Sequence, residues 1–346
     1  MEKKTIRLSV TLSALVIVFL LASWSMAADH SVWLPRPIPL GVSGINIEEV
    51  CSAGTLGSLV QKINRDVKFI LSNNHVLARE NDGVKGELII QPGSLDDGCQ
   101  FRRSNKVAKL KKFIPIVFST SASNEVDAAI AKIITGKVDE GGTILDIGQV
   151  STAPLDPQVG MEVKKAGRTT DLTFGEINAV GVTVDVGYST GTARFINQFT
   201  ITPGTFSAPG DSGSLIVTDE ATCPHPVGLL FAGSSTMTVA NPIKTVYQKL
   251  KVKPVGCPGA AVEGEVAGEM VQRDERIAQA IQVKNRHEEQ LLNVPGVVGV
   301  GIGLSKSQVV IKVFLEEMTS ELAQRLPDTL DGFSVVPEVT GKFIAY

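Results

Sequence analysis

A serine at position 212 lies between glycines in the segment Gly-Asp-Ser-Gly-Ser, residues 210–214. Because glycine tolerates backbone geometry that a Cβ would obstruct, this serine can lie on a tight turn with its hydroxyl group exposed. The backbone N–H groups of Gly210 and Ser212 can then converge on one point, which is how proteins stabilise an oxyanion. We therefore identify Ser212 as a candidate nucleophile. The alternative is an ordinary surface turn.

A serine nucleophile needs a general base, and histidine most often fills that role. The sequence has four histidines, and His75 is the one that lies between two strand-like runs, directly after an apolar strand. The other three lie at the predicted mature N-terminus, between two prolines and in a charged helix: His30, His225 and His287. We expect His75 to be the general base. A hydrogen-bonded structural histidine is the alternative.

Asp127 lies at the head of a small apolar strand predicted at residues 128–134. A carboxylate there tends to be buried and must find a hydrogen-bond donor, which an imidazole N–H supplies. Asp127 is therefore the candidate partner of His75. A cap at the start of the strand is the alternative.

Together these segments resemble the catalytic motifs of chymotrypsin-like (trypsin-fold) serine proteases. Residues 72–76, 127–130 and 210–214 match the three motifs of that family in the same order, and the three candidate residues are 52 and then 85 positions apart. The resemblance is closest to bacterial exported members and covers about residues 45–250. Residues 167–170 and 174–177 also resemble the segment that opens the second barrel in bacterial relatives.

The resemblance implies a double β-barrel with a catalytic cleft between the barrels, and hydrolysis of peptide bonds in polypeptide substrates. Ser212 would attack the scissile carbonyl while His75 accepts its proton, and Asp127 would orient the imidazole. The N–H groups of Gly210 and Ser212 would stabilise the oxyanion. This chemistry requires neither a metal nor an organic cofactor.

Two departures from the family pattern stand out. Asn73 and Asn74 precede the histidine where the familiar eukaryotic motif has two alanines, and no cysteine flanks it. Ser214 ends the serine motif where digestive relatives have glycine. Neither departure removes a catalytic group.

Substrate preference follows from the resemblance less directly. It places Phe206, or its neighbours, at the base of the primary substrate pocket, with Leu230 and Phe231 on the opposite wall. These segments carry neither an acid nor a base. We therefore expect a small or apolar side chain before the scissile bond, with Phe206 as a core residue being the alternative.

The elements that must position these residues are short strands bounded by turn residues, which indicate an all-β barrel or sandwich. They are predicted at residues 54–60, 68–72, 87–91, 106–112, 128–134, 162–165, 175–184, 198–201, 214–217 and 227–231, with a helix at 243–250. The predicted fold is mainly β: a chymotrypsin-like double β-barrel over residues 28–253, followed by a small α+β sandwich domain.

Residues 254–268 are rich in proline, glycine and alanine and read as a linker. The accessory domain, 269–346, is predicted to have the order α-β-β-α-β-β, with elements at 269–292, 297–304, 309–315, 319–325, 334–339 and 342–345. The glycines of residues 299–303 lie within a strand, which disfavours a nucleotide loop. This domain could control access to the cleft, bind a partner or assist folding. The sequence leaves intramolecular regulation open.

The first 27 residues are predicted to be a signal peptide. Lys3, Lys4 and Arg7 precede an apolar run of 17 residues and the small-residue site Ser25-Met26-Ala27. The alternative is an uncleaved membrane anchor, for which the run is short. We expect an exported protein, periplasmic or secreted, without membrane attachment after cleavage.

The four cysteines form no C-x-x-C pair, which disfavours a zinc site or a redox motif. In an oxidising compartment we expect two disulfides, Cys51–Cys99 and Cys223–Cys257, because each closes a moderate loop within one half of the chain. Two other connectivities and buried free thiols are the alternatives.

Composition excludes several other functions. The net charge of −3 and the 5% aromatic content argue against a nucleic-acid partner.

The serine motif lacks the second glycine of the G-x-S-x-G turn that α/β-hydrolase esterases use. A serine endopeptidase is the leading interpretation. The alternative is a catalytically silent protease fold that serves as a binding or scaffold module.

Overall fold

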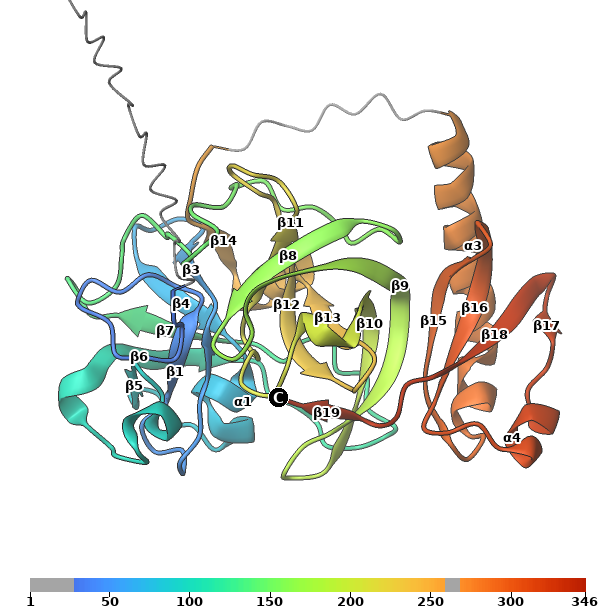
Figure 1. Cartoon of the computed structure of the whole chain (residues 1–346), viewed down its shortest axis with the longest axis horizontal. Coiled ribbons are helices and arrows are strands. Elements are labelled where there is room, and N and C mark those ends of the chain that lie inside the picture. The colour runs from blue at the N-terminus through green and yellow to red at the C-terminus, as the bar shows by residue number, and fades with distance from the viewer. Residues whose placement is uncertain (1–27, 259–267) are drawn as a thin grey trace, which may run out of the picture.

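The computed structural model describes residues 28–258 and 268–346 (Figure 1). The predicted signal peptide and residues 259–267 of the predicted linker lie outside these ranges. The described chain is mainly β, as the sequence predicts, with two packed barrels and a smaller helix-covered sheet beside the second barrel.

The first barrel is a closed ring of antiparallel strands. Its strands are β1 (Val42–Asn46), β2 (Gly54–Leu56), β3 (Ser58–Lys62), β4 (Lys68–Ser72), β5 (Leu88–Ile90), β6 (Lys106–Phe113) and β7 (Ala129–Ile133). β2 pairs with β1 and β3 pairs with β4. Because only Gly57 separates β2 from β3, they act as one strand that closes the ring through β7, β6 and β5.

The second barrel closes in the same way. Its strands are β8 (Glu162–Gly167), β9 (Asp171–Gly187), β10 (Thr192–Thr202), β11 (Leu215–Thr218), β12 (Pro226–Gly233) and β13 (Thr238–Pro242). They pair in the order β9-β8-β11-β12-β13-β10, and β10 returns to β9. Helix α2 (Ile243–Leu250) and strand β14 (Val252–Pro254) then cross back: α2 buries its apolar face in the core of the first barrel, and β14 pairs with β3.

The C-terminal region continues the second barrel. It contains α3 (Gly268–Leu292), β15 (Val297–Ser305), β16 (Gln308–Leu315), α4 (Ser320–Arg325), β17 (Thr329–Leu330), β18 (Phe333–Val339) and β19 (Phe343–Ala345). β15 pairs antiparallel with the long strand β9, so one sheet runs from the barrel into this region. Residues of α3, including Ala280, Val283 and Leu291, pack on this sheet.

The structure has four strands that the sequence pattern does not predict: β1, β13, β14 and β17. All four are short, and β1, β13 and β14 carry glycine, asparagine or proline. The strand expected at 342–345 forms as β19, but it does not join the small sheet. It pairs with β12 and β9 of the second barrel instead.

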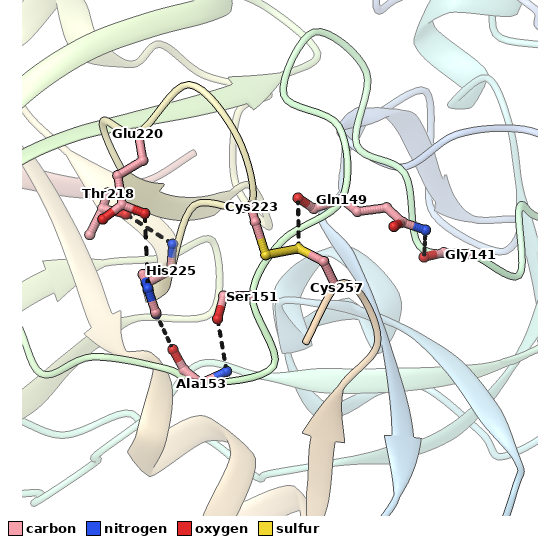
Figure 2. The surroundings of a disulfide bond; sticks show 9 residues. All are labelled: Gly141, Gln149, Ser151, Ala153, Thr218, Glu220, Cys223, His225 and Cys257. Atoms are coloured by element: carbon pink, nitrogen blue, oxygen red, sulfur yellow. Dashed lines mark hydrogen bonds and ion pairs between the residues drawn. A yellow bond between two sulfur atoms is a disulfide. The ribbon is translucent and has the colours of Figure 1, made fainter. Parts of the chain in front are cut away.

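Two disulfides join Cys51 to Cys99 and Cys223 to Cys257. Figure 2 shows the second, which ties the loop after β11 to the segment after β14. The backbone of Cys257 also pairs with Val150 through a hydrogen bond of 3.0 Å. Residues 254–257 of the predicted linker are therefore fixed to the barrels. None of the helices in the described ranges combines the length and the apolar character needed to cross a membrane.

Candidate active site

His75 and Asp127 meet in the first barrel. His75 is the second residue of α1 (Asn74–Leu77), the short helix that follows β4, and Asp127 lies just before β7. His75 Nδ1 is 2.5 Å from Asp127 Oδ2, and the carboxylate is fully buried. The N–H of Asn74 donates to Asp127 Oδ1 at 2.6 Å. Short hydrogen bonds of this kind hold a buried carboxylate in one orientation.

The two asparagines before His75 make hydrogen bonds that hold the backbone around it. The side-chain amide of Asn73 donates to the carbonyl oxygen of Asp127 at 2.8 Å. The amide of Asn74 donates to the side chain of Asn81 and to the carbonyl of Ile114, both at 2.8 Å. The pair therefore fixes the backbone on both sides of the His75–Asp127 contact, which two alanines could not do.

Tyr188 is a site residue that the sequence analysis missed. It follows β9 directly, and its hydroxyl donates to Asp127 Oδ2 at 3.0 Å. Its ring meets the His75 ring edge-on, with centroids 5.9 Å apart. Burial, aided by the negative charge of Asp127, raises the pKa of Tyr188 well above its ordinary value. The phenol therefore stays protonated and remains a donor. No local pattern marks this residue, because its partner lies 61 positions away.

The loop that carries Ser212 is anchored to both barrels. Thr55 of β2 donates its N–H to the carbonyl of Ser212 at 2.8 Å and its hydroxyl to the carbonyl of Gly210 at 3.0 Å. Gly213 donates to the carbonyl of Leu230 at 2.9 Å. Gly210 and Gly213 have φ values of +102° and +95°, a region that a residue with a Cβ rarely adopts. These contacts set the loop at the junction of β2 and β12.

Asp211 anchors the same loop from within. Its buried carboxylate accepts hydrogen bonds from the N–H of Thr169 at 2.8 Å and from the hydroxyl of Thr170 at 2.7 Å. The buried ammonium group of Lys165 lies 3.4 Å away. Burial lowers the pKa of Lys165, and the charge of Asp211 opposes that effect. Residues 167–170, the segment that resembles the opening of a second barrel, therefore hold the Ser212 loop through Asp211.

Two backbone donors in this loop are free. Among the described residues, neither the N–H of Gly210 nor that of Ser212 donates to an acceptor. The Ser212 hydroxyl donates to the carbonyl oxygen of Phe231 at 3.1 Å, not to His75. Unpaired donors beside a serine hydroxyl are suited to stabilising a negative oxygen, since their hydrogen-bonding capacity is unused.

His75 has a second acceptor. Its Nε2 lies 2.9 Å from the carbonyl oxygen of Tyr346. A doubly protonated imidazolium satisfies both this carbonyl and Asp127, since each can only accept. Burial lowers the pKa of His75, but the charge and hydrogen bond of Asp127 outweigh it, and the Tyr346 carbonyl adds to them. The net effect raises the pKa of His75.

The expected pocket residues are all buried. Phe206 and Leu230 belong to one apolar cluster of the second barrel, and Tyr346 packs against that cluster. Phe231 belongs to a neighbouring cluster. A cavity of about 650 Å³ borders His75 and the tail of the chain, and acidic residues, among them Glu49 and Glu80, line part of it.

The remaining histidines make structural contacts. Buried His30 contacts the carbonyl of Gly41 and the carboxylate of Asp146. His225 contacts the carbonyl of Ala153 at 2.6 Å beside the second disulfide, as Figure 2 shows. His287 lies 3.3 Å from Asp331 on the surface. Within residues 28–258 and 268–346, no cluster of histidine, cysteine and carboxylate side chains is arranged to hold a metal ion.

Comparison with known proteins gives two kinds of match. Residues 117–245 match the family described as the Nal1 C-terminal domain. No curated protein matches the chain in sequence.

Solved structures with a similar fold include a glutamic acid-specific serine protease, with 19% identity over 63% of this chain and 100% of that one and a TM-score of 0.43. Protease A of Thermobifida fusca has 15% identity over 64% of this chain and 99% of its own, with a TM-score of 0.42. The chymotrypsin of Cellulomonas bogoriensis has 16% identity over the same shares and the same TM-score.

Proposed function

We propose that the protein is a serine endopeptidase that works through Ser212, His75 and Asp127. The observation that carries this proposal is the buried 2.5 Å contact between His75 and Asp127, in a chain whose candidate serine lies beside two unpaired N–H groups. A hydrogen-bonded histidine–carboxylate pair next to such donors has the parts that acyl transfer requires.

The reaction divides the work among these residues. As the Ser212 oxygen bonds to the scissile carbonyl carbon, its proton passes to Nε2 of a neutral His75, and the N–H groups of Gly210 and Ser212 receive the oxyanion. Collapse of the intermediate breaks the C–N bond while His75 returns the proton to the leaving amine. Water then attacks the acyl carbon while His75 takes its proton, and the C–O bond to Ser212 breaks as His75 returns that proton to the serine oxygen. Asp127 stabilises the imidazolium in both halves.

Tyr188 completes the set as a positioning residue. It holds the Asp127 oxygen that faces His75 and packs against the imidazole edge. In this proposal it restricts the carboxylate and the ring to one arrangement without touching the substrate.

We further propose that the protein is exported and acts on polypeptides. The disulfides between Cys51 and Cys99 and between Cys223 and Cys257 support an oxidising compartment. The basic leader and apolar run of residues 1–27 support the same conclusion.

A fluorophosphonate probe tests the proposal, since it reacts only with a serine whose hydroxyl is activated. Mass spectrometry of the purified protein should find the probe on Ser212, and His75→Ala should abolish that modification while the protein stays folded. The Tyr346→Gly variant is labelled in parallel, because Tyr346 contacts His75. If neither form is labelled, the protein is a catalytically silent binding module instead.

A further inference from the structure

The end of the chain leaves its own sheet and enters the candidate active site. After β18, the N–H of Thr340 donates to the carbonyl of Leu315 at 2.8 Å, which holds the start of the tail. β19 then crosses from the C-terminal sheet toward α1, as Figure 1 shows. There it pairs antiparallel with β12, with Ala345 opposite Ala232 and Ile344 opposite Gly233.

The backbone of Tyr346 lies against both catalytic candidates. Its N–H donates to the carbonyl of Phe231 at 3.4 Å, and the Ser212 hydroxyl donates to that same carbonyl. Its own carbonyl oxygen lies 2.9 Å from His75 Nε2. An extended chain paired with β12, with its residue 346 between the Ser212 loop and His75, lies on the side of the cleft that the acyl part of a bound substrate would need. Its carbonyl oxygen faces His75 and not the N–H groups of Gly210 and Ser212.

The side chain of Tyr346 fills a site built for an aromatic ring. Its hydroxyl donates to the carbonyl of Ser234 at 3.2 Å, and the residue packs against the cluster that contains Phe206 and Leu230. Gly233 makes room for it, since a Cβ there would lie 2.5 Å from Tyr346 Cζ. The site thus has an apolar wall, free space at Gly233 and a backbone carbonyl, that of Ser234, which accepts the hydrogen bond of the phenol.

The residues before Tyr346 add to the fit. Phe343 is 1% exposed and lies in an apolar cluster with Phe314 and Phe231, whereas Ile344 is 49% exposed. This alternation is that of an extended strand with one face against the barrel. The tail is therefore held through its backbone, through Phe343 and through Tyr346.

We propose that residues 343–346 are an intramolecular ligand of the catalytic cleft, and that the pocket filled by Tyr346 selects substrates with a tyrosine before the scissile bond. This inference rests on the proposed protease function. A ligand tethered beside its site has an effective concentration in the millimolar range, so the full chain is latent toward substrates at lower concentration. The expected preference is tyrosine, which is narrower than the small or apolar side chain that the sequence predicts.

Latency is tested by the rate of fluorophosphonate labelling at Ser212. Tyr346→Gly removes the pocket ligand from the intact chain and should be labelled at least 10-fold faster than the parent. Val339→Thr is the matched control, because Val339 lies in the same C-terminal sheet and is 47% exposed. It should be labelled at the parental rate. A chain that ends at residue 343 keeps buried Phe343, removes the rest of the tail and should be labelled at least as fast as Tyr346→Gly. Equal labelling of all forms would overturn the latency.

Substrate preference is tested on a variant that binds but cannot react. In a Ser212→Ala chain that ends at residue 343, the peptide Ile-Ala-Tyr should bind at least 10-fold more tightly than Ile-Ala-Val, as measured by titration calorimetry. Equal affinities would overturn the assignment of the pocket. In the single variant Ser212→Ala the tail should exclude both peptides.

The two tests separate the inference from the proposed function. Tyrosine-selective binding with no labelling of any form would overturn the protease function. The cleft would then be a peptide-binding site that the tail occupies. Labelling at Ser212 without tyrosine selectivity would retain the protease and remove the inference. Labelling in the tail-free forms with tyrosine selectivity supports both.

Discussion

One oxygen of Asp127 receives two donors: Oδ2 lies 2.5 Å from His75 Nδ1 and 3.0 Å from the hydroxyl of Tyr188. Tyr188 comes from the hairpin between β9 and β10, whereas His75 and Asp127 belong to the first barrel. The second barrel therefore takes part in orienting the histidine, and the relative position of the barrels controls the geometry of the pair.

Tyr188→Phe should lower kcat about 10-fold, because a hydrogen bond to a charged group contributes about 1.5–3 kcal/mol. Without this donor the Asp127 carboxylate holds the imidazolium more strongly, so the pKa of His75 should rise. The acidic limb of the pH profile of kcat/KM should then move to higher pH, a shift that simple loosening of the fold would not produce. The profile should be measured in the Tyr346→Gly background, which leaves the pocket free.

Tyr247→Phe is the matched control for that change. Tyr247 is also buried, and its hydroxyl has no hydrogen-bond partner among the described residues. It should leave both kcat and the pH profile unchanged. An equal loss in both variants would show that Tyr188 acts only through packing.

The sequence marks the candidate residues of the site more clearly than the residues around them. His75, Asp127 and Ser212 stand out because each belongs to a local pattern: a strand end, a strand start and a glycine turn. Tyr188 has no such pattern, and its role depends on a contact between distant segments. The local strand pattern of residues 342–345 is real, yet local alternation does not specify which strand is the partner. The pattern therefore predicts a strand of the small sheet, whereas the structure pairs β19 with β12 and β9 of the second barrel.

Asp211→Asn should destabilise the fold by about 3–5 kcal/mol, since it removes the carboxylate that is paired with the buried ammonium group of Lys165. It also weakens the hydrogen bonds that join the Ser212 loop to Thr169 and Thr170. Urea unfolding followed by far-ultraviolet circular dichroism measures the change. Asp219→Asn is the control.

Asp219 also faces a lysine, Lys164, at 3.5 Å, but its side chain is 37% exposed. Solvent screens such a pair, so its loss should cost less than about 1 kcal/mol. If the two variants lose similar free energies of unfolding, the buried pair of Asp211 and Lys165 stabilises the fold no more than the exposed pair does.

The stability of the latent chain should fall as the pH rises through the pKa of His75. The folded state raises that pKa above its ordinary value of 6.5. As the pH rises, the unfolded chain therefore loses the His75 proton at a lower pH than the folded chain does. The stabilisation is therefore complete below pH 6.5 and is lost above the folded pKa. The groups that face or influence His75 are Asp127, Tyr188, Glu80, Glu49 and the carbonyl of Tyr346.

Free energies of unfolding at pH 6 and pH 9 in the parent and in His75→Gln test this dependence. The parent should lose more stability between the two pH values than the variant does, since glutamine does not titrate. Equal losses would assign the pH dependence to other groups. The same proton predicts that the parent is labelled by a fluorophosphonate faster as the pH rises, because neutral His75 both releases the tail carbonyl and activates Ser212.

Gly233→Ala should convert the aromatic pocket into a smaller one. The added methyl group would lie 2.5 Å from Tyr346 Cζ, so the ring cannot stay in place. Gly233 has no positive φ, and the substitution therefore adds no backbone strain of its own. Binding of Ile-Ala-Tyr should weaken at least 10-fold in the Ser212→Ala chain that ends at residue 343, while binding of Ile-Ala-Val should hold or improve.

In the otherwise intact chain, the same substitution should expel the tail and speed labelling of Ser212, as Tyr346→Gly does. Gly187→Ala is the control, because a Cβ there would lie 3.7 Å from the tail, an ordinary contact. It should leave labelling and peptide preference unchanged. If Gly233→Ala leaves the tail bound and tyrosine preferred, Tyr346 does not define the pocket. If it frees Ser212 and shifts preference toward valine, the missing side chain at position 233 sets both latency and specificity.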